Sequence, residues 1–179
     1  ALEARLNEAV RSARDATGAV SHPAREFVAE VWPHAVEASR KTGIPPQFMV
    51  AQAALETGWG QKQLRNPDGS PSHNLFNIKA GSAWKGDTVA REVTEYANGQ
   101  AYTEQSRFRA YGSYAESFRD YANLITRSPR YAEVLGQTDA AAFARGLQDA
   151  GYATDPMYAD KLTRIIGGNT LRSALAMAG

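Results

Sequence analysis

The sequence predicts an α+β fold that is mainly helical and contains one inserted β-hairpin. Apolar residues recur at helical spacing in several segments on both sides of a central region. In that region Asn98-Gly99 separates two segments typical of strands, and this dipeptide is the strongest short-range hairpin signal. The 179 residues, 43% of them hydrophobic, suit one globular domain with a short arm.

The composition excludes several classes of site. The chain has no cysteine, which rules out disulfides, thiolate zinc sites and cysteine nucleophiles. The formal net charge of +1 shows no basic bias of the kind that favours nucleic acid. No run of about 18 apolar residues exists, so we expect no membrane span. No signal peptide is visible, and a first residue of Ala rather than Met leads us to expect an excised or processed chain.

Residues 1–20 differ from the rest of the chain, since they are charged and rich in alanine. Leu2, Leu6 and Val10 recur at helical spacing. We therefore expect an exposed arm or linker helix over residues 1–20 and the domain itself over residues 21–179.

Two helices are expected before the hairpin. Ser21 can cap a helix that runs to about Lys41, with Phe27, Val28, Val31, Trp32, Ala35 and Val36 as its apolar stripe. Pro45-Pro46 can start the second helix, because proline suits the first helical turn. Gly58 is expected to end it, since glycine accepts the left-handed conformation of a helix terminator.

The rest of the chain follows from composition and periodicity. Residues 59–86 are rich in Gly, Asn, Ser and Pro and are predicted to form a loop. The hairpin is expected over residues 87–111. Further helices are expected at about 113–126, 139–149 and 156–177, with Asp155 as the cap of the last one.

Glu56 stands at the end of the second helix, where an apolar face would be expected. The residues three, four and seven positions before it are Ala53, Gln52 and Met49. Burial on this face, the negative end of the helix and shielding by Trp59 would all raise the pKa of the carboxyl, as a general acid requires. The alternative is a solvated glutamate at a frayed helix end, and spacing alone leaves both open.

Several segments together resemble one known family. They are WPHAVEASRKTGIPPQFMVAQAALETGWG, NLFNIKA, GDTVAREVTEY, RFRAY and GYATDPMYADKL, spread over roughly residues 25–165. The sequence resembles the glucosaminidases of glycoside hydrolase family 73, whose fold is lysozyme-like. Within that family it is most like the peptidoglycan-hydrolase domain of bifunctional flagellar rod-assembly proteins.

The resemblance implies roles for three residues and for the hairpin. Glu56 matches the catalytic acid of the family, Glu95 its second important carboxylate, and Tyr152 an aromatic residue that handles substrate. The hairpin would form one side of the cleft. Two positions depart from the common pattern: Asn77 stands where many relatives have Gly, and Thr57 where Ser is common.

The alternation of the first strand distinguishes its two carboxylates. Glu95 shares a face with Val93 and Val89 and is expected to look toward the protein body, whereas Glu92 lies on the other face. With the resemblance, this favours Glu95 for the cleft and a solvated position for Glu92. Because Glu95 lies near a flexible turn, we also expect the hairpin to act as a lid.

Further candidates are residues that could bind sugars. Aromatic rings stack on the apolar faces of sugars, and the aromatic residues near the motifs are Trp59, Phe76, Tyr96, Tyr102, Tyr152 and Tyr158. Asn74 and Asn77 could bond acetamido groups. The alternatives are core packing for the aromatics and turn formation for the asparagines. The three histidines lack the spacing of metal ligands, so we expect neither a metal nor a cofactor.

The resemblance predicts an endo-β-N-acetylglucosaminidase that cleaves the peptidoglycan bond between N-acetylglucosamine and N-acetylmuramic acid. It implies a periplasmic location and a role in letting the flagellar rod cross the wall, with rod proteins as partners of a preceding N-terminal part. The alternatives are a lytic transglycosylase and a non-catalytic wall-binding scaffold. Inversion, retention and substrate assistance all stay open.

Overall fold

The structure is a computed structural model that describes residue 5 and residues 22–178. The predicted arm lies outside the described residues except for Arg5, so that prediction is not tested. Within the described part, the prediction of a mainly helical α+β fold with one inserted hairpin is confirmed. The helices are α2 (His22–Thr42), α3 (Pro46–Thr57), α4 (Tyr114–Arg127), α5 (Ala140–Asp149), α6 (Tyr158–Ile166) and α7 (Asn169–Ala178).

Two expectations for the second half of the chain were wrong. A single helix over 156–177 was expected, but α6 and α7 are separated by Gly167 and Gly168, because adjacent glycines weaken a helix. Asp155 does not cap α6, which starts at Tyr158; its carboxylate instead accepts from the Met157 N–H at 2.9 Å. A short 3₁₀ helix, η1 (Pro129–Val134), was not expected at all.

Helix α3 is the central helix of the domain and carries Glu56 in its last turn. Every residue from Phe48 to Ala54 is buried, because α3 packs against both α2 and α6. Pro46 starts the helix, and Gly58 ends it with φ 55° while its N–H bonds to the Ala54 carbonyl. This termination fixes where the Glu56 side chain leaves the core.

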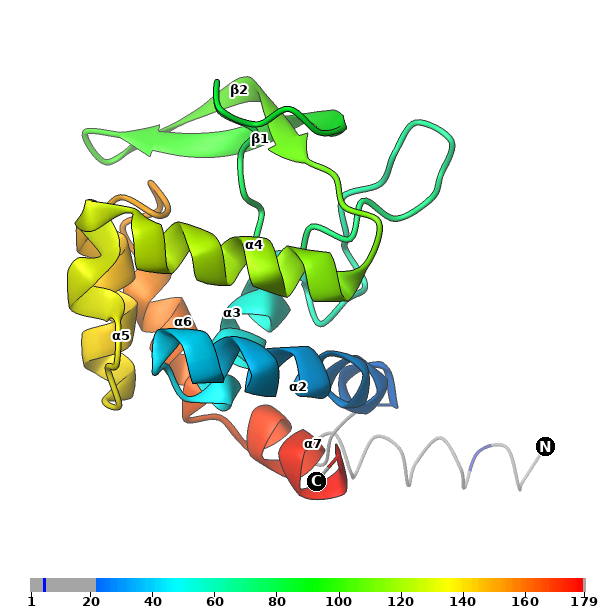
Figure 1. Cartoon of the computed structure of the whole chain (residues 1–179), viewed down its shortest axis with the longest axis vertical. Helices are drawn as coiled ribbons and strands as arrows, with labels where there is room; N and C mark the ends of the chain where they lie inside the picture. Colours follow the sequence, from blue (N-terminus) through cyan, green and yellow to red (C-terminus); the bar gives the residue numbers. More distant parts are fainter. Residues whose placement is uncertain (1–4, 6–21, 179) are drawn as a thin grey trace.

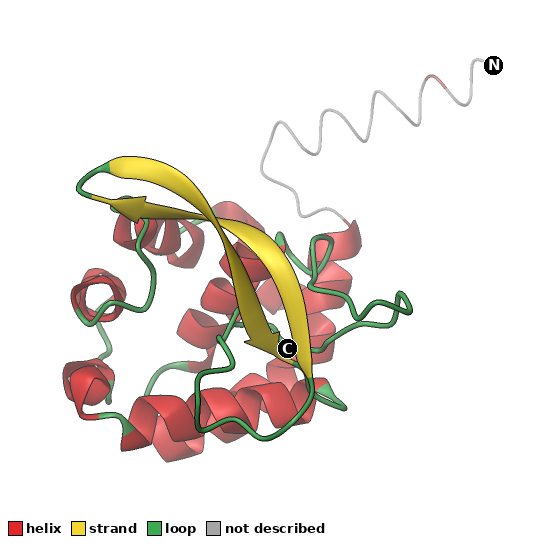
Figure 2. Cartoon of the chain, turned by 90° about the horizontal axis from the view of Figure 1, so that it is seen from above, coloured by secondary structure: helices red, strands yellow, loops and turns green. Residues whose placement is uncertain are grey.

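The hairpin consists of β1 (Thr88–Ala97) and β2 (Gln100–Arg109), which pair antiparallel. Asn98 and Gly99 have φ 53° and 77°, the left-handed values that a tight two-residue hairpin turn demands. The hairpin lies above α4, on the opposite side of the molecule from α7 (Figure 1), and arches over the helices when seen from above (Figure 2).

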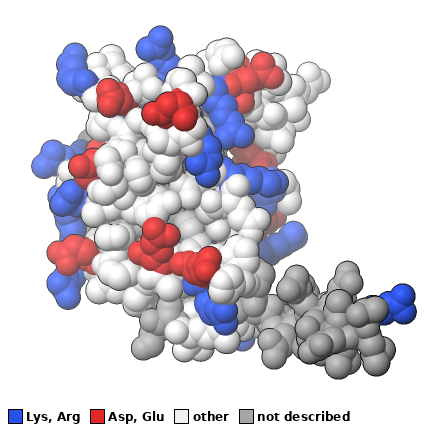
Figure 3. Space-filling view, turned by 90° about the vertical axis from the view of Figure 1, so that its right-hand side faces the viewer, with Lys and Arg blue, Asp and Glu red and all other residues white. Residues whose placement is uncertain are grey.

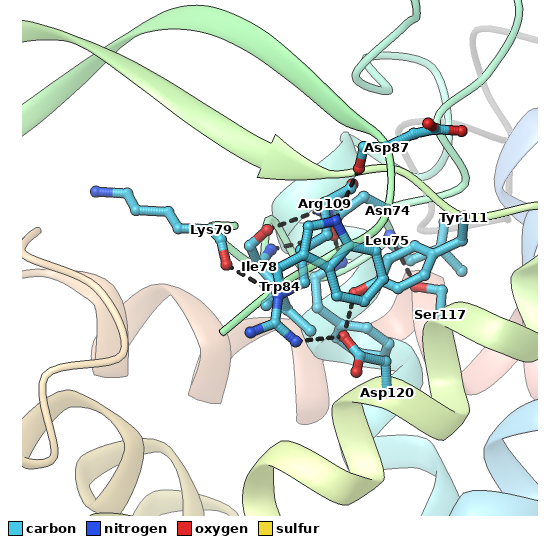
Figure 4. A network of polar contacts seen from close by, with 11 residues as sticks. Asn74, Leu75, Ile78, Lys79, Trp84, Asp87, Arg109, Tyr111, Ser117 and Asp120 are labelled. Atoms are coloured by element: carbon cyan, nitrogen blue, oxygen red, sulfur yellow. Dashed lines mark hydrogen bonds and ion pairs between the residues drawn. The ribbon is translucent and has the colours of Figure 1, made fainter. Parts of the chain in front are cut away.

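The base of the hairpin is tied to the helical body, as an isolated two-stranded sheet needs for stability. The Arg109 guanidinium pairs with Asp120 of α4 at 2.8 Å, and the Tyr111 hydroxyl donates to the same carboxylate at 2.5 Å (Figure 4). The Arg109 N–H also bonds to the Ile78 carbonyl at 3.0 Å. The loop before the hairpin and helix α4 therefore hold its base, while its turn end extends away from this anchor.

The surface carries charges of both signs. Figure 3 shows acidic and basic side chains intermixed over one face, in keeping with the net charge of +1. Among the residues that the structure describes, no helix has both the length and the apolar character needed to cross a membrane.

Candidate active site

A cleft of about 570 Å³ lies between the hairpin and the helical body. Its walls come from the end of α3, the loop 77–81, the segment 93–95 of β1, η1, and the loop 151–155. Glu56, Glu95, Asn77 and Tyr152 all line it, so four of the residues predicted from the sequence meet in one place. A larger, shallower hollow beside the loop 66–68 and Trp84 contains neither carboxyl group.

Glu56 is a half-buried residue whose carboxyl is buried and favours its protonated form. Burial raises its pKa from 4.5 to about 8, although hydrogen bonds from Tyr158 and Asn77 act in the opposite direction. The carboxyl therefore carries its proton at neutral pH. Trp59, which was expected to shield it, does not line the cleft; it packs against the core just beyond the helix end, with φ 58°.

Asn77 links the loop 77–81 to the acid. Its side-chain amide donates to the Glu56 backbone carbonyl at 3.1 Å and approaches the Glu56 carboxyl at 3.4 Å. The φ of Asn77 is 49°, in the left-handed region where glycine is favoured and asparagine is the best-tolerated alternative. Asparagine thus fits a backbone conformation that glycine would also accept, and its amide adds a donor beside the Glu56 carboxyl.

A buried hydrogen-bond chain reaches Glu56 from the core. The Tyr121 hydroxyl donates to the Gln52 side-chain oxygen at 2.5 Å, and the Gln52 amide nitrogen donates to the Tyr158 hydroxyl at 3.0 Å. The Tyr158 hydroxyl in turn interacts with the Glu56 carboxyl and lowers its pKa. A tyrosine has one proton to donate, and because Gln52 occupies an acceptor site of Tyr158, that proton is left for Glu56.

Sequence reasoning placed Gln52 on the face of Glu56 but gave it no role. Its side chain is fully buried among apolar neighbours. The available signal was an amide, four residues before Glu56, inside the otherwise apolar run 48–55 of α3. Such a group must find partners inside the protein, and only the fold shows that the partners are two tyrosines.

Glu95 is held as an anion on the opposite side of the cleft. Lys79 donates to one carboxylate oxygen at 2.8 Å, and the Thr154 hydroxyl donates to the other at 2.5 Å. Burial alone would raise the pKa of Glu95, but these two hydrogen bonds and the charge of Lys79 outweigh it and hold the pKa below its ordinary value. The exposed position of Glu92 on the other face agrees with the predicted alternation.

Thr154 also joins the hairpin to the loop 151–155. Its hydroxyl oxygen accepts from the Tyr96 backbone N–H at 3.0 Å while the hydroxyl donates to Glu95. Neither Thr154 nor Lys79 was predicted as a site residue, although both lie inside the sequence motifs. Each meets Glu95 only through the tertiary fold.

Tyr152 forms a wall of the cleft next to the acid. Its hydroxyl donates to the Phe76 carbonyl at 2.6 Å, and its ring stacks on Tyr158 with centroids 6.1 Å apart. The hydroxyl is therefore used within the protein, and the half-buried ring is the part that lines the cleft.

The remaining predicted residues lie outside the cleft lining. Asn74 is buried, and its amide donates to the Ile78 and Arg109 carbonyls at 3.0 and 2.9 Å (Figure 4). Phe76 is buried and stacks on Tyr121 with centroids 4.0 Å apart. Tyr158 is buried in the core. Tyr96 and Tyr102 lie on the hairpin, where Tyr102 is 45% exposed.

An uncharged carboxyl and a charged one in the same cleft make up the pair of groups that glycoside hydrolysis requires, a proton donor and a carboxylate. Residues 32–171 match the glucosaminidase family, described as mannosyl-glycoprotein endo-beta-N-acetylglucosaminidase. The chain belongs to this glucosaminidase family, as the resemblance indicated.

Individual relatives agree with this assignment. The sequence is 49% identical to peptidoglycan hydrolase FlgJ of Escherichia coli (strain K12), over 79% of this chain and 45% of that protein. It is 44% identical to peptidoglycan hydrolase FlgJ of Salmonella typhimurium, over 93% of this chain and 53% of that protein. The chain thus spans about half the length of these relatives.

Two solved structures share the fold over most of their length. A peptidoglycan hydrolase mutant from Sphingomonas sp. A1 is 58% identical, with a TM-score of 0.84, over 86% of this chain and 99% of that chain. The glycoside hydrolase domain of Salmonella typhimurium FlgJ is 44% identical, with a TM-score of 0.63, over 80% of this chain and 86% of that chain. The predicted lysozyme-like fold is confirmed.

Proposed function

We propose that this domain is an endo-β-N-acetylglucosaminidase that hydrolyses peptidoglycan between N-acetylglucosamine and N-acetylmuramic acid. One observation carries the proposal: Glu56, with a pKa near 8, and Glu95, with a lowered pKa, line the same open cleft. Membership of the glucosaminidase family and the relatives named peptidoglycan hydrolases support the choice of bond and substrate.

In this mechanism Glu56 is the general acid and protonates the glycosidic oxygen as the bond breaks. Glu95 acts as a base or as an electrostatic stabiliser of the positive charge that develops on the sugar ring. The contacts with Lys79 and Thr154 keep that carboxylate ionised and fixed. The Tyr152 ring lines the cleft, where a sugar can stack on it. The Asn77 amide donates to the Glu56 carboxyl and orients it.

The test is product analysis on purified peptidoglycan. Wild-type protein should release fragments with reducing N-acetylglucosamine ends, whereas a lytic transglycosylase would leave anhydro-muramic ends. Glu56→Gln should lose at least about a thousandfold in rate, because an amide cannot donate the acid's proton. Sedimentation with intact sacculi without any cleavage would instead indicate the wall-binding scaffold and overturn the proposal.

The location and the cellular role extend the same proposal. We place the protein in the periplasm, where its substrate lies, and assign it to opening the wall for the flagellar rod. The similarity to FlgJ proteins supports this role. Rod proteins as partners stay a prediction, which cross-linking to rod proteins in cells would test.

A further inference from the structure

The charged residues that line the cleft leave one charge uncompensated. Lys79 pairs with Glu95, and Arg109 pairs with Asp120, both at 2.8 Å. Asp155 pairs with Lys161 at 2.5 Å in the same way.

Two ionisable residues of the cleft lining remain outside these ion pairs, Glu56 and Arg130. Glu56 is neutral at pH 7 because its pKa is about 8. Among the described residues, Arg130 has no acidic partner within ion-pair distance. The formal charge of the cleft is therefore positive and is located at this arginine.

The position of Arg130 is defined by its neighbours. It lies in the first turn of η1, directly after Pro129. Its guanidinium carbon lies 4.7 Å from the centre of the Tyr131 ring, and one of its nitrogens donates to the Ala150 carbonyl at 3.4 Å. The same nitrogen is 3.7 Å from where a Cβ on Gly151 would lie. The guanidinium thus rests on the backbone that leads directly into Tyr152.

These contacts hold the guanidinium in place without using its binding capacity. The bond to Ala150 is long, and Arg130 is exposed. A guanidinium has five donors in a planar fork that matches a carboxylate. An arginine without an acidic partner, fixed at the wall of a substrate cleft, is suited to bind an anionic group of the ligand.

We propose that Arg130 binds a carboxylate carried by the muramic-acid side of the glycan strand and thereby sets which bond faces Glu56. This inference rests on the proposed function. Peptidoglycan alternates two sugars, so two kinds of glycosidic bond follow one another along the strand. The backbones of the two sugars are alike, but only muramic acid carries a lactyl group, to which the peptide stem with its carboxylates is attached.

A carboxylate-binding subsite to one side of Glu56 would therefore determine which of the two kinds of glycosidic bond is placed at Glu56. When Arg130 meets a muramic-acid substituent, the sugar placed across the cleft at Glu56 is fixed as well. The carboxylate can come from the peptide stem, or from the lactyl group where the stem is missing. Both sources offer the same chemistry to the guanidinium.

The experiment compares soluble glycan strands whose carboxylates are free with the same strands after conversion of the carboxylates to amides. Wild-type protein should cleave the amidated strands with kcat/KM reduced about two- to fivefold, as expected for an exposed charge pair. Arg130→Gln should lose about the same factor on the free strands and show no further loss on the amidated ones. Arg130→Lys should keep part of the preference, because it keeps the charge but loses the planar fork.

Arg127 provides the matched control. It is exposed at the end of α4, three residues before Arg130, and does not line the cleft. Arg127→Gln should therefore retain the full wild-type preference. A third substrate, strands freed of stem peptides by an amidase, identifies the source: a preserved effect of Arg130→Gln indicates the lactyl carboxylate, and a lost effect indicates the stem.

Two outcomes would overturn the proposal. The first is wild-type protein that cleaves free and amidated strands equally well. The second is an Arg130→Gln variant that loses the same factor on both, which would reduce Arg130 to support for the Tyr152 loop. Failure of the wild type to cleave any strand would instead contradict the proposed function, so the two failures are distinguishable.

Discussion

The side-chain amide of Gln52 donates a hydrogen bond to the Tyr158 hydroxyl at 3.0 Å inside the core, one step away from the acid. This bond joins a fully buried group, which never meets substrate, to the residue that we propose as the proton donor. It directs the only proton of the Tyr158 hydroxyl toward Glu56. Gln52 is thus a positioning residue for the acid.

Replacing Gln52 with Met should therefore affect both stability and turnover. The hydroxyls of Tyr121 and Tyr158 would each lose a partner in the core, at about 1–3 kcal/mol for each unsatisfied group. Because Gln52 does not line the cleft, kcat should fall while KM changes little. Urea unfolding and steady-state kinetics would check this. Gln63→Met, at a half-buried amide outside the cleft, is the control, and a raised KM with unchanged kcat would contradict the prediction.

Tyr158→Phe should shift the pH dependence of catalysis. The Tyr158 hydroxyl lowers the pKa of Glu56 from what burial alone would give, so its removal should raise that pKa further above about 8. A general acid works while it is protonated, and the alkaline limb of kcat should therefore move to higher pH. The loss of an orienting hydrogen bond should also lower kcat about tenfold. A pH profile with an unmoved alkaline limb would show that Tyr158 does not act on the acid.

The sequence predicted those parts of the fold that depend on local pattern. The ends of α3 followed from Pro46 and Gly58, and the hairpin from Asn98-Gly99, because these residues determine the backbone conformation at their own positions. The break between α6 and α7 was missed, although two adjacent glycines marked it.

The site was predicted only in part, because its contacts join distant segments. Glu95 and Thr154 are 59 positions apart, and Gln52 and Tyr158 are 106 apart. No spacing rule connects such residues before the chain is folded. Asn74 lies in NLFNIKA, one of the segments that resemble the family. Its side-chain amide nevertheless donates to backbone carbonyls of its own loop and of the hairpin base.

Glu56→Gln should change how stability depends on pH. The folded pKa of Glu56 is about 8, against 4.5 for the free group, so between these values the folded state holds a proton that the unfolded state has lost. The contribution of Glu56 to the free energy of unfolding should then be greatest below pH 4.5 and fall as pH rises toward 8, whereas glutamine has no such dependence. The variant should match wild type near pH 4 and exceed it by about 4 kcal/mol at pH 8, because one pKa unit corresponds to about 1.4 kcal/mol.

Urea unfolding at pH 4, 6 and 8 would measure this difference. Glu92→Gln, at an exposed position on β1, serves as the control and should track wild type at each pH. A difference between Glu56→Gln and wild type that stays constant across the range would mean that Glu56 ionises in the folded protein as it does in water. That result would remove the basis for its role as the acid.

Thr154→Val should weaken the contact by which the loop 151–155 holds Glu95 of the hairpin. The change removes the hydroxyl that donates to Glu95 at 2.5 Å and accepts from the Tyr96 N–H at 3.0 Å, while it keeps the shape of the side chain. Since this hydrogen bond lowers the pKa of Glu95, its loss should raise that pKa toward the ordinary value. Because the proposed role of Glu95 needs its charged form, activity should then be lost at a higher pH as the pH is lowered.

The acidic limb of kcat/KM should accordingly move upward in Thr154→Val, with a loss of activity that grows as the pH falls below about 5 and little loss at pH 7. Lys79→Met should move the limb further, because it removes a charge as well as a hydrogen bond. Thr103→Val, at an exposed position on β2, should leave the profile unchanged. If Thr154→Val and Lys79→Met share the wild-type acidic limb, the charge on Glu95 does not limit the reaction, and its proposed part in the mechanism is wrong.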